Sequence, residues 1–379
     1  MKIAIAIDSF KGSMTSQEAG VAAAKGIRAV FPDASICIRP LADGGEGTVT
    51  AITEGMGGSF RTITVTGPNG KPTDCCYGIL SASRTAIIEM SGAAGITLVQ
   101  GKEKNPLHTT TFGVGQVIRD AVSQGCRNFI VGIGGSATND GGAGMLQALG
   151  FDFLDAAGNP IPYGVQGLSL LKNIDNTHVL PELKECTFRI ACDVTNPLCG
   201  PDGCSAIFGP QKGADTEMIA LMDPWLAHYA DLTKKIYPGA DPDYPGCGAA
   251  GGLGFAFRTF LNASLESGIK IVLEETHMED FIKDADIVIT GEGRLDAQTV
   301  MGKAPFGVAQ MAKKYGKPVL AFSGCVTPDA IACNQAGIDA FFPILRSVVS
   351  LEEAMDTDAA KANMSASVEQ VFRVIKTFI

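Results

Sequence analysis

The sequence lacks most of the short motifs that reveal a protein's chemistry at once. No segment fits the phosphate-binding loop GxxxxGK[ST], and the glycines near residue 132 do not complete a GxGxxG dinucleotide fingerprint. No GxSxG elbow is present, which disfavours an esterase. The four histidines have no spacing that suggests a metal triad, and the eleven cysteines include no CxxC pair. Zinc-knuckle and thioredoxin-type sites are therefore not indicated.

The chain also has no apolar run near the roughly 18 residues needed to span a bilayer. Its net charge of -10 disfavours nucleic acid or an anionic membrane as a partner. Residues 2–7 predict a strand that meets Asp8 at once, which is unlike a signal peptide. We expect a cytoplasmic protein whose cysteines are mostly reduced, small buried residues.

What the sequence does have is glycine, 46 residues of it, and a hydrophobic fraction of 46%. A length of 379 residues suggests about two domains. Predicted strands alternate with helical patterns, which is typical of α/β domains with parallel sheets covered by helices. The first strand and the last three, near residues 288, 320 and 342, resemble one doubly wound set. The sequence does not say whether they share a sheet.

The most informative segment is VGIGGSATNDGGAGM, residues 131–145. An apolar run ends at Gly134 and Gly135, a polar loop follows, and a helical pattern begins after residue 142. Backbone N–H groups at such a strand-to-helix turn can bind an anionic group. The alternative is a tight turn without a ligand. The loop supplies Ser136, Thr138, Asn139 and Asp140 as candidate contacts.

Four other predicted strands end in a similar cluster of acids and glycines. In open α/β sheets, ligands bind outside the carboxyl ends of the strands. A single Asp there could be only a helix N-cap. The residues at these ends are Asp8, Ser9 and Lys11; Asp43, Gly44, Gly45 and Glu46; Asp193 and Asn196; and Glu292, Arg294 and Asp296. Lys212, on a loop between glycines, could contact phosphate or be a solvated surface lysine.

Carboxylates on glycine-rich turns suit Mg²⁺, which binds through one or two carboxylates, waters and phosphate. Phosphoryl transfer needs positioning, Mg²⁺, N–H donors and one or two cations rather than covalent help from the protein. The inventory of small-residue loops, acids and lysines matches that chemistry.

At these residues the sequence resembles the bacterial glycerate kinases of glucarate and glyoxylate breakdown. The matching segments follow one another along nearly the whole chain: DSFKGS (8–13), ADGGEGT (42–48), NPLHTTTFG (105–113), IGGSATNDGGAGM (133–145), CDVTNPL (192–198), FGPQKGA (208–214) and GEGRLDAQT (291–299). Two departures are small. Ile7 stands where relatives usually have Pro, and Gln116 stands where many have Glu.

The resemblance implies ATP-dependent phosphorylation of D-glycerate to 2-phosphoglycerate by Mg²⁺-assisted in-line transfer. It also implies two α/β domains. One is Rossmann-like with a parallel sheet built from both chain ends, residues 1–85 plus 285–379. The other is a mixed α/β domain inserted at residues 86–284. We expect the active site in the cleft between them.

On this basis we assign candidate roles. Asp193, Lys11 and Asp8 are the candidate catalytic residues, with Asp193 as base or hydroxyl orienter. Asp43, Glu46, Glu292 and Asp296 are candidate Mg²⁺ ligands. The candidate substrate and phosphate contacts are Ser9, Gly44, Gly45, Gly134, Gly135, Ser136, Thr138, Asn139, Asp140, Asn196, Lys212 and Arg294.

Several alternatives stay open. The enzyme could form 3-phosphoglycerate or phosphorylate another sugar acid, and a non-catalytic hydroxy-acid binding protein ranks lower. A dinucleotide-dependent oxidoreductase would need the fingerprint that is absent. The sequence does not decide which hydroxyl is phosphorylated, which acid binds metal, or whether the chain forms a homo-oligomer.

Overall fold

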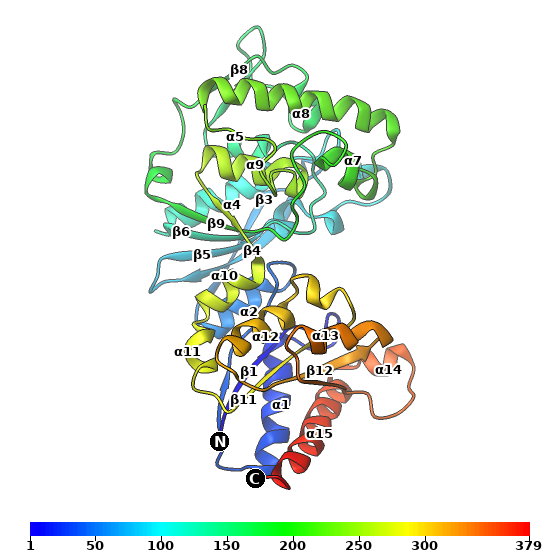
Figure 1. Ribbon diagram of the computed structural model, residues 1–379. Coiled ribbons are helices and arrows are strands. Elements are labelled where there is room, and N and C mark those ends of the chain that lie inside the picture. The colour runs from blue at the N-terminus through cyan, green and yellow to red at the C-terminus, as the bar shows by residue number, and fades with distance from the viewer. The chain divides into compact units, whose positions relative to one another are not determined.

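The computed structural model describes residues 1–379, which divide into two compact units (Figure 1). The first unit comprises Met1–Asp43, Thr50–Gly57 and Ile269–Ile379. The second comprises Gly44–Val49 and Gly58–Gly268. None of the helices combines the length and the apolar character that crossing a bilayer requires.

The first unit contains a five-stranded sheet in the order β13-β12-β11-β1-β2, with every pair parallel. The first strand and the last three therefore share one sheet, which confirms the Rossmann-like fold built from both chain ends. Counted along this unit, the order is 2-1-3-4-5, and it reverses between β1 and β11. The strands are β1 (Lys2–Ile7), β2 (Ser35–Ile38), β11 (Ile287–Leu295), β12 (Val319–Val326) and β13 (Ala340–Pro343).

Helices α1 and α15 lie side by side in the first unit (Figure 1) and share a core with Ile3, Ile5 and Ile7 of β1. Because side chains alternate along a strand, these three isoleucines cover one face of the sheet. Helix α12 contacts β11 and β1. The helices of this unit are α1 (Ser16–Val30), α2 (Thr48–Gly55), α10 (Gly268–Glu275), α11 (Met278–Ile282), α12 (Ala304–Lys314), α13 (Ala332–Gln335), α14 (Leu351–Met355) and α15 (Thr357–Lys376).

The second unit contains a six-stranded sheet in the order β10-β9-β6-β5-β4-β3. Strands β10, β9, β6 and β5 are parallel, whereas β4 and β3 form an antiparallel hairpin at the edge. The strands are β3 (Ser59–Thr66), β4 (Pro72–Leu80), β5 (Thr85–Glu89), β6 (Asn128–Gly132), β9 (Thr187–Ala191) and β10 (Ser264–Glu266), with a separate pair β7 (Asp152–Leu154) and β8 (Asn173–Asp175).

This hairpin changes the domain boundary that the sequence suggested. Residues 59–80 were assigned to the first domain, but they extend the sheet of the second unit. Residues 269–284, assigned to the inserted domain, belong to the first unit. The reason is pairing: β4 forms backbone hydrogen bonds with β5, and this partnership is not encoded locally.

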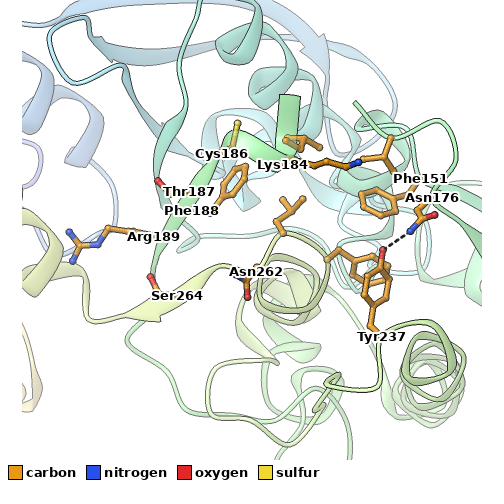
Figure 2. Close-up of a pocket in the computed structure, with 14 residues that line it drawn as sticks. Phe151, Asn176, Lys184, Cys186, Thr187, Phe188, Arg189, Tyr237, Asn262 and Ser264 are labelled. Carbon is orange, nitrogen blue, oxygen red and sulfur yellow. Dashed lines mark hydrogen bonds between the residues drawn. The ribbon is translucent and has the colours of Figure 1, made fainter. Parts of the chain in front are cut away.

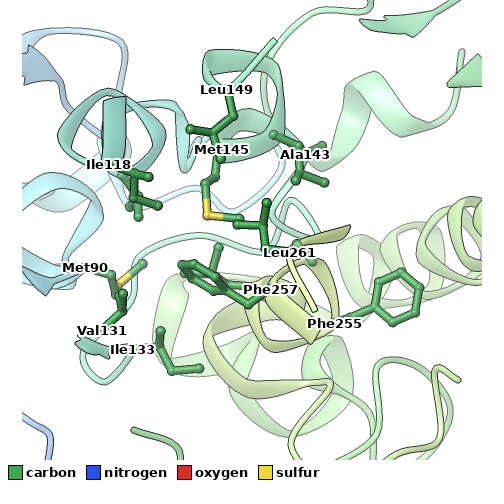
Figure 3. Close-up of a cluster of buried hydrophobic side chains, with 14 of the residues drawn as sticks. Met90, Ile118, Val131, Ile133, Ala143, Met145, Leu149, Phe255, Phe257 and Leu261 are labelled. Atoms are coloured by element: carbon green, nitrogen blue, oxygen red, sulfur yellow. The ribbon is translucent and has the colours of Figure 1, made fainter. Parts of the chain in front are cut away.

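A large apolar core fills the second unit (Figure 3). Val131 of β6, Met145 of α5 and Phe257 of α9 are each fully buried in it. Burial of apolar side chains at about 25 cal/mol per Å² is the main force that holds such a unit together. The helices are α3 (Ser91–Ala94), α4 (Phe112–Ser123), α5 (Ala143–Ala148), α6 (Val165–Leu168), α7 (Cys204–Phe208), α8 (Thr216–Ile236) and α9 (Ala249–Phe260).

Candidate active site

Two acidic side chains lie at the point where the strand order reverses: Asp8 directly follows β1, and Glu292 lies within β11, which continues to Leu295. The backbone N–H of Asp8 donates to the carbonyl oxygen of Gly291 at 2.9 Å. Asp8 therefore lies next to the Gly291–Glu292 segment of β11. Only glycine fits at position 291, because a Cβ there would lie 2.0 Å from the carbonyl oxygen of Phe322. This reversal point is where doubly wound sheets bind ligands.

Asp8 is held in an unusual electrostatic environment. Its side chain is 8% exposed, and burial raises its pKa to about 7. The neighbouring carboxylates of Asp43 and Glu292 also raise this pKa, whereas the N–H of Ser9 and the ammonium of Lys11 lower it. Desolvation and like charges both disfavour an ionised carboxyl group. The site therefore concentrates negative charge that a bound cation would relieve.

Glu292 is fixed by two groups that the sequence analysis did not single out. Thr299 Oγ1 donates to Glu292 Oε1 at 2.6 Å, and Lys303 Nζ lies 3.9 Å from Oε2. Burial is the main cause that raises the pKa of Glu292. Lys11 comes three residues after Asp8, but Lys303 comes seven residues after Asp296, so sequence spacing did not identify it.

Arg294 and Asp296 form an ion pair with each other, so these two charged side chains do not require a ligand to balance them. Arg294 Nε lies 3.2 Å from Asp296 Oδ2, and Lys303 Nζ lies 3.4 Å from Oδ1. Asp296 Oδ1 also accepts the N–H of Gln298 at 2.9 Å. These contacts occupy the carboxylate of Asp296, whereas the guanidinium of Arg294 stays largely exposed.

A cavity of about 430 Å³ lies beside Asp8 and Glu292 in the first unit. The structure thus brings several predicted residues together in one place: Asp8, Ser9, Lys11, Asp43, Glu292 and Arg294. Pockets of about 300–1,000 Å³ are typical of small-molecule sites. These residues from separate segments thus lie at one cavity, and their roles stay predictions.

The carboxylates at this cavity fit a hard divalent cation. No group of three or more His, Cys, Asp or Glu side chains stands ready to hold a metal. Mg²⁺, however, is usually bound by one or two carboxylates together with water and phosphate. Asp43 raises the pKa of both Asp8 and Glu292, so the acids are electrostatic neighbours. Of the other predicted ligands, Asp296 is ion-paired, and Glu46 is an exposed residue of the second unit.

In the second unit, the glycine-rich loop after β6 has an exposed part and a buried part. Gly134 and Gly135 are exposed, and Gly135 adopts a φ of 71° that favours glycine. The Gly135 carbonyl accepts the N–H of Ile96 at 2.8 Å, and Ser136 forms a β-bridge with Gly95. The backbone at residues 134–135 is therefore held in place while it remains open to a ligand, whereas Ser136 is buried.

The rest of this loop corrects the sequence prediction. Thr138, Asn139, Asp140 and Lys212, which we expected to contact substrate or phosphate, are 0–1% exposed. Lys212 Nζ donates to the carbonyl oxygen of Thr138 at 2.6 Å. Asn139 Nδ2 donates to Ser205 Oγ at 2.8 Å. With so little accessible surface, these four side chains stabilise the loop from within the core of the second unit.

Asp140 shows how that support is built. Its carboxylate accepts the N–H groups of Thr111 at 2.8 Å, Gly142 at 3.1 Å and Gly144 at 3.3 Å, and the hydroxyl of Thr111 at 2.9 Å. Burial raises the pKa of Asp140, and these donors oppose the rise. Burial also lowers the pKa of Lys212 to about 8. Each buried charge is thus hydrogen-bonded, as such groups require.

The segment Gly44–Val49 lies against the carboxyl ends of the second sheet. Gly44 has a φ of +88°, and a Cβ on it would lie 2.5 Å from the Cβ of Ala191. Glu89, the last residue of β5, accepts the N–H of Val49 at 2.8 Å. The sequence analysis missed Glu89, although it ends a strand as the other acids do.

Asp193 and Asn196 follow β9 in the same unit. Asp193 is exposed, and its Oδ1 accepts the N–H of Gly268 at 3.2 Å. Asn196 Nδ2 donates to the carbonyl oxygen of Asp202 at 2.9 Å. These contacts orient both side chains at the carboxyl end of the sheet. Their assignment as catalytic and substrate-binding residues stays a prediction.

A second cavity, of about 660 Å³, lies near the amino ends of β9 and β10 (Figure 2). Thr187 and Ser264 begin these strands, and Asn176 Nδ2 donates to Tyr237 Oη at 3.3 Å within the lining. The lining includes no carboxylate. Because α/β sheets bind ligands at the opposite strand ends, this cavity is the poorer candidate for phosphoryl chemistry.

Comparison with known proteins shows similarity over the whole chain. The profile of the glycerate kinase family matches residues 3–376. Glycerate 2-kinase of Escherichia coli (strain K12) is 50% identical over 354 residues, 93% of each chain. Glycerate kinase of Haemophilus influenzae is 44% identical over 99% of each chain. The crystal structure of a protein from Salmonella typhimurium LT2 assigned as glycerate kinase 2 matches with a TM-score of 0.92, at 45% identity and covering 100% of this chain and 98% of that one.

Proposed function

The chain belongs to the glycerate kinase family and is a glycerate kinase, and from this premise we propose that it transfers the γ-phosphate of ATP to the 2-hydroxyl of D-glycerate. The kinase assignment requires a phosphoryl donor, which we take to be ATP. The name of the Escherichia coli relative, at 50% identity, supports position 2.

The observation that carries this proposal is the charged cavity of the first unit. Three carboxylates, of Asp8, Asp43 and Glu292, share it with Lys11 and Arg294. Phosphoryl transfer is driven chiefly by positioning and by stabilisation of charge on the phosphoryl oxygens. A mixed set of acids and cations at a strand-order reversal provides both.

We assign the holding of Mg²⁺ to Asp43 and Glu292, with Asp8 beside them. When bound, the ion would neutralise charge on the β- and γ-phosphates. Lys11 and Lys303 would then contact phosphate oxygens as point charges. Ser9 lines the same cavity and offers a hydroxyl to the phosphate chain.

We assign the acceptor to groups of the second unit. The exposed backbone at Gly134 and Gly135 suits the carboxylate of glycerate, because N–H groups at such turns bind anions. Asp193 would orient the attacking hydroxyl and accept its proton. Asp140 and Lys212 would hold the loop without touching substrate.

A coupled ADP-release assay tests the proposal. Purified protein is supplied with Mg-ATP and either D-glycerate, L-glycerate or a related hydroxy acid, and the product is identified by phosphorus NMR. We expect D-glycerate to be the best acceptor and the new phosphorus signal to couple to the proton on carbon 2. A product phosphorylated on carbon 3, or a preference for another sugar acid, would replace the assignment. Binding of glycerate without ADP release would reject catalysis.

A further inference from the structure

The cavity of the first unit has two chemically different halves. One half carries the charged groups that follow β1 and those that lie within β11. The other half is formed by the segment around α14 and contains only apolar side chains: Ile344, Leu345, Leu351, Ala354, Met355 and Ala360. A ligand that fills the cavity must therefore join a strongly charged part to an apolar part.

The apolar half presents open surface. Leu351 is 78% exposed and Met355 is 37% exposed, although both line the cavity. Apolar area left in water costs about 25 cal/mol per Å², so a flat apolar ligand group that covers these side chains would gain binding energy.

This apolar wall is anchored to the loop that carries the charges. Thr357 Oγ1, just after α14, donates to the carbonyl oxygen of Ser13 at 2.7 Å. A Cβ on Gly12 would lie 2.9 Å from Met355 Cε, so this side chain packs directly on the loop after β1. Ser350 caps α14 by accepting the N–H of Glu353 at 3.2 Å. The two halves are thus parts of one preformed pocket.

We infer that this pocket is the nucleotide site, with the purine base against Leu351 and Met355 and the phosphates toward Lys11, Arg294 and Lys303. The inference rests on the proposed function, which supplies ATP as the donor. Glycerate has three carbons, a carboxylate and two hydroxyls, and so offers no apolar face. A purine has two apolar faces and is attached to a polyanion, which matches both halves of the cavity.

A cysteine in the pocket wall gives a direct test on the unmodified protein. Cys325 lines the cavity and is exposed. Cys76, on β4 of the second unit, is also exposed and serves as an internal control. The rate of alkylation by iodoacetamide is followed at both thiols by mass spectrometry of the peptides, with ADP, with D-glycerate and with neither.

With ADP at about ten times its Kd, we expect alkylation of Cys325 to slow about tenfold, because only the free fraction reacts. Cys76 should react at an unchanged rate, and D-glycerate alone should protect neither thiol. Unchanged alkylation of Cys325 by saturating ADP, in a protein that phosphorylates glycerate, would overturn the inference and leave the proposed function intact. Protection by D-glycerate alone would also overturn it.

A pair of variants provides an independent readout. Ala354→Trp fills the apolar half and should raise the KM for ATP at least about tenfold while the KM for D-glycerate changes less than about twofold. The control is Val348→Trp, because Val348 is fully exposed and does not line the cavity. A rise in the KM for glycerate alone, or equal effects of the two substitutions, would contradict the placement.

Discussion

The buried ammonium of Lys212 donates a 2.6 Å hydrogen bond to the carbonyl oxygen of Thr138. Lys212 is thus buried inside the second unit, where it hydrogen-bonds the loop that carries Gly134 and Gly135. Its charge has been removed from water, and burial lowers its pKa to about 8. The cost of that burial should be visible in the pH dependence of stability.

We predict that Lys212→Met alters this dependence between pH 8 and 10.5. In that window the unfolded lysine keeps its proton while the folded one loses it, so the free energy of unfolding of the native sequence rises with pH. The contribution is at most about 1.4 kcal/mol per pH unit. Urea unfolding at several pH values should show a smaller slope for Lys212→Met. The exposed Lys184 provides the control, Lys184→Met, whose slope should match the native protein. Equal slopes in all three proteins would refute the prediction.

Asp8→Asn should lower kcat/KM by roughly ten- to a hundredfold, since a charge-assisted contact contributes about 1.5–3 kcal/mol. The substitution keeps the shape of the side chain and removes the ionisable carboxyl group that lies beside Asp43 and Glu292. Circular dichroism should confirm that the fold persists. Asp33→Asn, at an exposed position of the same unit, should leave turnover unchanged. If Asp8→Asn retains turnover within about twofold, Asp8 has no part in catalysis.

Asp193→Asn tests the assignment of the base. Oδ1 of Asp193 accepts the N–H of Gly268, so an amide oxygen can keep that contact while the proton acceptor is lost. We expect kcat to fall by at least about tenfold with little change in the KM for ATP. Asp231→Asn, on the exposed side of α8, is the matched control. Near-normal turnover would show that Asp193 is not the catalytic base.

Because Gly251 packs against the glycine-rich loop and Gly158 does not, we predict that alanine substitutions at these two glycines destabilise the protein unequally. Gly251 has a φ of +67°, and a Cβ on it would lie 2.1 Å from the carbonyl oxygen of Thr138. Gly158 has a φ of +81° with nothing near the added atom. Gly158→Ala should cost about 1 kcal/mol of unfolding free energy from backbone strain alone. Gly251→Ala should cost about 1–3 kcal/mol more, because it also overpacks the loop.

Chemical denaturation of the two alanine variants measures this difference directly. Gly251→Ala should also lower kcat/KM, because displacing the Thr138 carbonyl shifts the same loop that presents Gly134 and Gly135. Equal destabilisation by both substitutions would show that the contact with Thr138 is not tight.

Much of the fold could be predicted from the sequence. Short apolar runs closed by acids and glycines predicted the parallel strands. The turn signal GPNG at residues 67–70 is also visible in the sequence, and it joins β3 to β4, where the Gly67 N–H donates to the Lys71 carbonyl oxygen at 2.7 Å. Residues 351–378 have a helical pattern in the sequence, but the structure divides them into two helices, because Asp356 ends α14 and caps α15 by accepting the N–H of Ala359. Such caps are local, and this one was overlooked.

The candidate site could be predicted in kind and only partly in detail. Of the strand-end residues assigned to the site, Asp8, Asp43 and Glu292 line one cavity of the first unit, whereas Asn139 and Asp193 belong to the second unit. The predicted placement of the active site between two domains stays a prediction. Thr299, Lys303 and Glu89 were missed, because each acts through a partner that only the fold supplies.

The sequence by itself determined the α/β class, the acidic and glycine-rich strand ends and the family, because these depend on residue types and their order along the chain. The tertiary structure decided which of those residues face a ligand. Asp140 and Asp8 look alike in the sequence as acids in a loop that follows a strand, yet one is enclosed by four donors and the other lines a charged cavity. Burial depends on packing between distant segments, and no local pattern of residues carries that information.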